Sequence, residues 1–169
     1  MLKNPEKAKD IFKIVLAVLI FCTVAFIIIQ SCLPPDVSSD ESEAVSGFLS
    51  SILPEGTWIY SFVTENTRKL AHFFEYGALG FELSVYTIVY LRKKQLYFAI
   101  LSVGSLLLGL LDETIQIFSN RGPAIIDVWI DTAGFNVFLY LTLGAYCLFA
   151  AVMRKFKYRS NLKKDNQNG

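Results

Sequence analysis

The stretch IVLAVLIFCTVAFIIIQSCL, residues 14–33, contains no charged side chain. As a helix that rises about 1.5 Å per residue, it would span about 30 Å, the thickness of the hydrocarbon core of a bilayer. The chain as a whole is 53% hydrophobic with a mean hydropathy of +0.44, values that soluble domains rarely reach. The sequence therefore predicts an integral membrane protein. Lysines precede the stretch, as in a cleaved signal, but it is long for a signal and we expect it to stay attached.

Three further apolar stretches are long enough to cross a membrane, at residues 70–91, 96–118 and 127–152. Because backbone groups cannot stay unpaired in lipid, each stretch is expected to be helical. We therefore predict an all-α fold in which residues 1–153 form a four-helix transmembrane bundle. Residues 154–169 are basic and polar, and we expect them to form a disordered cytoplasmic tail.

The distribution of basic residues predicts the orientation of the bundle. Of the 16 lysines and arginines, 13 lie before the first span, between the second and third, or after the fourth. The opposite side has only Arg68, Lys69 and Arg121. Since basic residues concentrate on the cytoplasmic side, both termini are expected to be cytoplasmic.

The first outer loop, residues 34–67, is expected to contain a short helix that lies on the membrane surface. Its apolar side chains recur three and four positions apart, at Val45, Phe48, Leu49 and Ile52. The polar residues 38–41, just before them, offer N-capping side chains.

Polar side chains gather near the predicted outer ends of the three later spans. They are Arg68, His72, Glu75, Asp112, Glu113, Gln116, Arg121, Asp127 and Asp131. Spacings of three and four residues place those of each span on one helical face. A charged side chain that faced lipid would be costly, so we expect these residues to converge into one outward-opening pocket. The alternative is a buried polar network that only fixes helix packing.

The residue types suggest roles within this pocket. His72 is the only histidine of the chain and is the natural proton-transfer group near neutral pH. The candidate catalytic residues are His72, Glu75, Asp112, Glu113 and Asp127. The candidate ligand-binding residues are Arg68, Gln116, Arg121 and Asp131, the arginines because a guanidinium binds phosphate bidentately.

No metal ligand is assigned from the sequence, and no cofactor is identified. The carboxylates would suit a hard cation such as Mg²⁺. Zinc is less favoured because the chain has one histidine and no cysteine near it.

The predicted spans contain several glycines, and we expect neighbouring helices to pack closely at these positions. They are Gly77, Gly80, Gly104, Gly109 and Gly134.

Three motifs resemble those of the VanZ-like family. They are Arg68-Lys69-x-x-His72-Phe73-x-Glu75-Tyr76-x-x-Leu79-Gly80, Asp112-Glu113-x-x-Gln116-x-Phe118-x-x-Arg121 and Asp127-x-x-x-Asp131-Thr132-x-Gly134. The resemblance covers residues 14–150, although Cys32 stands where the family commonly has a serine. It implies a protein of the bacterial inner membrane. The namesake of the family is linked to low-level resistance to teicoplanin, a lipid-bearing glycopeptide antibiotic.

The sequence leaves three kinds of function open. The first is an enzyme acting on a lipid head group or a lipid-linked cell-wall intermediate at the outer leaflet. The second is a non-catalytic protein that binds or shields a wall precursor or the antibiotic, and the third is a small carrier or proton relay. Membrane lipids are the expected partners, and no oligomeric state is predicted. Nucleic acid is not an expected partner, because topology explains the basic residues.

Overall fold

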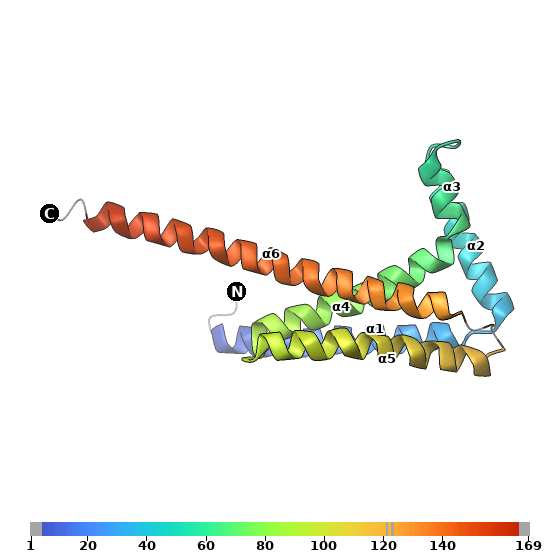
Figure 1. The fold of residues 1–169 in the computed structure, drawn as a ribbon, viewed down its shortest axis with the longest axis horizontal. Helices are drawn as coiled ribbons and strands as arrows, with labels where there is room; N and C mark the ends of the chain where they lie inside the picture. Colours follow the sequence, from blue (N-terminus) through green and yellow to red (C-terminus); the bar gives the residue numbers. More distant parts are fainter. Residues whose placement is uncertain (1–4, 121, 123, 166–169) are drawn as a thin grey trace.

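The computed structural model describes residues 5–120, 122 and 124–165, and the regular structure of these residues is entirely helical (Figure 1). The helices are α1 (Pro5–Cys32), α2 (Pro35–Ile52), α3 (Trp58–Glu65), α4 (Thr67–Tyr90), α5 (Lys94–Phe118) and α6 (Ile125–Asp165). The predicted all-α class is confirmed.

Three of these helices are long and apolar enough to cross a membrane, over Glu6–Cys32, Lys94–Phe118 and Ile125–Arg159. The second predicted span corresponds to α4. This helix is long enough but not apolar enough to be recognised as a membrane span, because charged side chains interrupt it. Instead, α4 packs against all three apolar helices and makes its most extensive contact with α6. In the described part of the chain, α4 is thus the helix with the most helix neighbours, although charged side chains interrupt it.

The distribution of side chains fits a bundle surrounded by lipid. Several buried positions are polar, including Ser84, Thr87, Ser105, Asp112, Gln116 and Asp131. Large apolar side chains point outward on α1, α5 and α6, including Ile14, Phe21, Val103, Leu107, Leu141 and Phe149. Soluble proteins rarely expose apolar surface so extensively. Together with the apolar length of α1, α5 and α6, this identifies a membrane protein.

The chain ends and the connections between long helices divide between the two ends of the bundle (Figure 1). The start of α1, the turn between α4 and α5, and the end of α6 lie at one end. The two short helices α2 and α3 and the connection from α5 to α6 lie at the other. The segments rich in lysine and arginine therefore share one end of the bundle.

The segment between α1 and α4 forms two helices where one short surface helix was predicted. The expected N-cap at residues 38–41 is wrong, because α2 already begins at Pro35. The N-cap residue is Pro34, and its side chain makes no capping hydrogen bond. Proline suits the first helical position, where its fixed φ is already helical and no N–H is needed. The cap of α3 is Thr57, whose Oγ1 accepts a hydrogen bond from the N–H of Tyr60 over 3.2 Å.

The basic C-terminal segment does not form the expected disordered tail, because α6 continues through it to Asp165. The sequence from residue 145 to residue 165 contains neither glycine nor proline, the residues that most readily end a helix. Residues 166–169 lie outside the described part of the chain.

Two glycines allow the backbones of α4 and α6 to touch. A Cβ atom at Gly80 would lie 2.2 Å from the carbonyl oxygen of Phe135, and one at Gly134 would lie 2.1 Å from that of Phe73. Both contacts are too short for any side chain, so the predicted close packing is confirmed at these positions. It is wrong at Gly104, where an added Cβ would have no neighbour within 4 Å.

Candidate functional site

Three polar side chains from three different helices meet inside the bundle. They are His72 of α4, Asp112 of α5 and Asp131 of α6, and we call them the trio. Nδ1 of His72 lies 3.2 Å from Oδ1 of Asp131 and 3.9 Å from Oδ2 of Asp112. The side chains of Asp131 and Asp112 are 0% and 3% exposed, and that of His72 is 12% exposed. The trio is therefore almost completely removed from solvent.

Close packing of α4 on α6 explains why His72 and Asp131 meet. The backbone contact between these helices joins Phe73 and Gly134. Phe73 directly follows His72, and Gly134 lies about one helical turn after Asp131. A glycine at this position therefore lets the helices approach until the imidazole reaches the carboxylate.

Hydrogen bonds hold Asp112 from two neighbouring helices. Nε2 of Gln116, one turn further along α5, donates to Oδ2 of Asp112 over 2.9 Å. Nη2 of Arg68 on α4 donates to Oε1 of Gln116 over 3.0 Å. The hydroxyl of Ser31, a buried residue at the end of α1, donates to Oδ1 of Asp112. The carboxylate of Asp112 is therefore fixed in orientation from α1 and, through Gln116, from α4.

Asp131 is held less completely. Neither of its carboxylate oxygens accepts a hydrogen bond from the described residues, and Nδ1 of His72 also lacks a hydrogen-bond partner among them. The 3.2 Å between Nδ1 and Oδ1 suits an ion pair, but the geometry does not meet that of a hydrogen bond. Buried polar atoms in native proteins almost always have a partner, so these atoms require an explanation.

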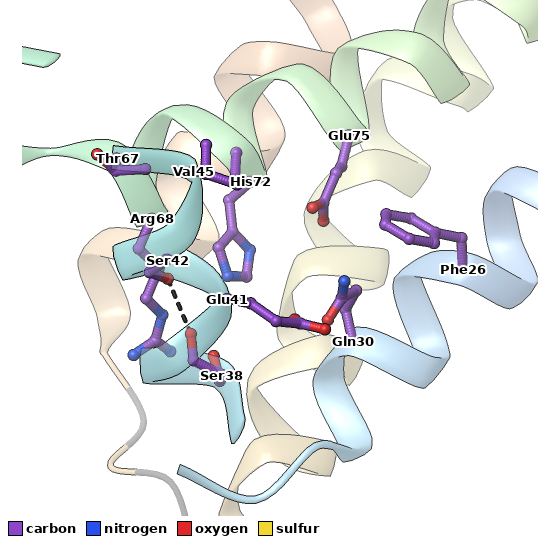
Figure 2. Close-up of a pocket in the computed structure, with 11 residues that line it drawn as sticks. Phe26, Gln30, Ser38, Glu41, Ser42, Val45, Thr67, Arg68, His72 and Glu75 are labelled. Atoms are coloured by element: carbon purple, nitrogen blue, oxygen red, sulfur yellow. Dashed lines mark hydrogen bonds between the residues drawn. The ribbon is translucent and has the colours of Figure 1, made fainter. Parts of the chain in front are cut away.

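A polar cavity of about 190 Å³ opens beside the trio, between α1, α2 and α4 (Figure 2). Its polar lining includes Gln30, Glu41, Ser42, Arg68, His72 and Glu75. Figure 2 shows the side chains of His72, Glu75 and Gln30 directed into the space between the three helices. We call this cavity the polar pocket.

A second hollow, of about 170 Å³, is almost entirely apolar and lies between α1, α4 and α5. Its lining residues are Val24, Ile27, Ile28, Tyr76, Leu79, Leu108, Leu111, Asp112 and Ile115. We call it the apolar groove. Asp112 is the one acidic or basic residue among those that line the groove. The groove therefore connects apolar helix surfaces with a member of the trio.

The structure brings together some of the predicted site residues and separates others. His72, Asp112 and Asp131 meet, Gln116 and Arg68 support them, and Glu75 lines the polar pocket. The structure thus brings these six side chains close together, while their roles and the single outward-opening pocket stay predictions.

Glu113 and Asp127 take other positions. Oε2 of Glu113 accepts a hydrogen bond from the N–H of Ala124 over 2.8 Å and so holds the connection between α5 and α6. Asp127, in the first turn of α6, is buried. Within the described residues, no hydrogen bond or ion pair joins either carboxylate to the trio. Arg121 lies outside the described residues.

Some residues of the site were not anticipated from the sequence. Ser31 and Gln30 are polar residues at the end of an otherwise apolar stretch, which was a usable signal. Glu41 reaches the polar pocket because α2 folds back toward α4, and no local pattern indicates that contact.

Comparison with known proteins shows the family of the chain. The sequence model of the VanZ/LLP1 family matches residues 14–149, which is most of the chain. The chain belongs to the VanZ/LLP1 family. The match includes the whole trio, all of α4 and α5, and α6 as far as residue 149. No curated protein and no solved structure matches the chain.

The three motifs that resemble the VanZ-like family each supply one member of the trio. The first contains His72, the second Asp112 and the third Asp131. In this VanZ/LLP1 protein the motifs, which are distant in sequence, therefore meet at one point of the bundle.

Proposed function

We propose that this VanZ-like protein acts on the head group of a lipid or of a lipid-linked cell-wall intermediate at the outer leaflet of the bacterial inner membrane. By doing so it lowers the sensitivity of the cell to teicoplanin. In this proposal the protein has four spans, α4 included, and both termini are cytoplasmic. The polar pocket then opens toward the outer leaflet.

The observation that carries the proposal is the proximity of the polar pocket and the apolar groove. The pocket is lined by His72 and the groove by Asp112, and Nδ1 of His72 lies 3.9 Å from Oδ2 of Asp112. A lipid combines an apolar chain with a polar head group. A chain in the groove would therefore place the head group of the same molecule near the trio.

The groups around the polar pocket favour an anionic head group. A guanidinium has five N–H donors in a rigid plane, so the bond from Arg68 to Gln116 fixes the group while other donors can bind phosphate. Glu75 and Glu41 line the same pocket and can accept hydrogen bonds from head-group hydroxyl or amino groups. These contacts would orient a phosphorylated head group against His72.

Two observations support α4 as the fourth span. Its polar residues Arg68, His72 and Glu82 contact α1, α5 or α6, so the bundle can shield them from lipid. The turn from α4 to α5 lies at the same end as the start of α1, and both carry lysines, as the positive-inside rule requires of cytoplasmic segments.

The proposal is tested in bacterial cells that express the wild-type chain, Arg68→Gln, Glu75→Gln or the control Glu43→Gln, which alters an exposed residue of α2. Phospholipids and lipid-linked wall precursors are profiled by mass spectrometry, and teicoplanin sensitivity is measured at equal protein level. The wild type and the control should change one lipid species and lower sensitivity. The two pocket variants should do neither.

The two readouts separate the alternatives. Lower teicoplanin sensitivity without any altered lipid or precursor would favour the non-catalytic protein that binds or shields its ligand. Pocket variants that match the wild type in both readouts would refute a role for the polar pocket.

A further inference from the structure

We propose that His72, Asp112 and Asp131 bind a divalent transition-metal cation. One potential ligand atom from each residue, Nδ1 of His72 and a carboxylate oxygen of each aspartate, lies within 4.8 Å of the other two. Ligand atoms about 2.0–2.2 Å from a common metal lie about 3–4 Å from one another. The separations of 3.2 Å and 3.9 Å from Nδ1 already match this spacing.

The charges of the trio favour a bound cation. Asp112 and Asp131 are both buried, and together they carry two negative charges when ionised. A protonated His72 would supply only one positive charge, and the hydrogen bond of Arg68 goes to the neutral amide of Gln116. A divalent cation with a neutral imidazole would balance both carboxylates, and uncompensated charge in an apolar interior is costly.

The unpartnered atoms of Asp131 give independent support. Its side chain is 0% exposed, and neither oxygen accepts a hydrogen bond within the described part of the chain. Nδ1 of His72, which faces this carboxylate, also donates no hydrogen bond there. Coordination by a cation would satisfy Oδ2 of Asp131, and it would also bind Oδ1 and Nδ1, which face each other over 3.2 Å without hydrogen-bond geometry.

Asp112 has the surroundings of a metal-bound carboxylate. Ser31 and Gln116 donate hydrogen bonds to its two oxygens from the side of α1 and from α5. Such outer partners orient the carboxylates that bind metals, and each oxygen keeps a further lone pair for the ion.

The ligand types indicate the class of metal. An imidazole nitrogen with two carboxylates suits Mn²⁺ or Zn²⁺, whereas Mg²⁺ prefers oxygen ligands alone. Three protein ligands leave a coordination position open, and His72 also lines the polar pocket. His72 is then a metal ligand rather than the proton carrier expected from the sequence. The role of the ion as a contact for an anionic head group rests on the proposed function, but metal binding itself does not.

The test uses the purified full-length chain in lipid nanodiscs, first stripped with a chelator. Mn²⁺, Zn²⁺ or Mg²⁺ is then supplied separately, and bound metal and the thermal unfolding midpoint are measured. The wild type should retain about one Mn²⁺ or Zn²⁺ per chain, and its midpoint should rise by about 5 °C at saturating metal. Mg²⁺ should bind more weakly.

Variants locate the ion. Asp131→Asn and His72→Gln should lose the bound metal and the rise of the midpoint, while Asp40→Asn, at an exposed position of α2, should keep both. In the presence of chelator, Asp131→Asn should unfold no earlier than the wild type, because one uncompensated carboxylate has been removed. This measurement also shows whether the variant folds.

The same assay separates this inference from the proposed function. The Arg68→Gln variant should no longer lower teicoplanin sensitivity, but it should still bind metal. If this variant both binds metal and lowers teicoplanin sensitivity, the result would count against the proposed function but not against the metal site. A stripped wild-type chain that takes up none of the three ions would overturn the metal site. Equal uptake by the wild type and Asp131→Asn would overturn it as well, because the ion would then lie elsewhere.

Discussion

Arg68 and Gln116 connect α4 to α5 through a hydrogen bond of 3.0 Å from Nη2 to Oε1. The amide of Gln116 is completely buried, and its nitrogen donates to Asp112 over 2.9 Å. A neutral side chain thus lies between a cation and a carboxylate, accepting from one and donating to the other. This arrangement fixes Asp112 without forming an ion pair between Arg68 and the trio.

Gln116→Leu should destabilise the protein because it removes the amide that donates to Oδ2 of the buried Asp112 and accepts from Arg68. Loss of a partner by a buried polar group costs about 1–3 kcal/mol, and more where the group is charged. The free energy of unfolding in detergent or nanodiscs measures the effect. Gln95→Leu, which makes the same change at an exposed position near the start of α5, is the matched control. Equal stability of the two variants would show that these hydrogen bonds contribute nothing.

Gly134→Ala should disrupt the packing of α4 on α6. Its Cβ would lie 2.1 Å from the carbonyl oxygen of Phe73, so backbone must move, and overpacking of this kind costs about 1–3 kcal/mol or more. Gly104→Ala is the control, because an added Cβ there meets nothing within 4 Å and alanine favours a helix by up to about 1 kcal/mol. Thermal unfolding of both variants decides the matter. A Gly134→Ala protein as stable as Gly104→Ala would contradict the close contact.

Cysteine labelling in intact cells should place α4 across the membrane. The three native cysteines are first replaced by alanine, and single cysteines are introduced at Glu43, Lys93 and Lys157, which are all exposed. An impermeant maleimide should label position 43 from outside, and positions 93 and 157 only after the membrane is opened. The reason is that the basic turn after α4 belongs on the cytoplasmic side. External labelling of position 93 would mean that α4 does not cross.

The sequence by itself determined the class of the fold, the position of the long helices and the polar residues from which the site is built. These follow from local properties, since an apolar stretch of about 20 residues specifies a membrane helix whatever surrounds it. It also indicated that His72 shares a helical face with Arg68 and Glu75, because that follows from the period of the helix. The glycines Gly80 and Gly134 were recognised in the same way, as small residues in apolar helices.

Only the tertiary structure decided which of these residues meet. Asp112 and Glu113 are neighbours in sequence, but successive helical residues point about 100° apart. Asp112 therefore joins His72 and Asp131, while Glu113 turns to the backbone of Ala124. The contribution of α2 to the polar pocket was likewise undetermined, because it depends on how the chain folds back after α1. Helical periodicity specifies the face on which a side chain lies, but the packing of the helices specifies what that face meets.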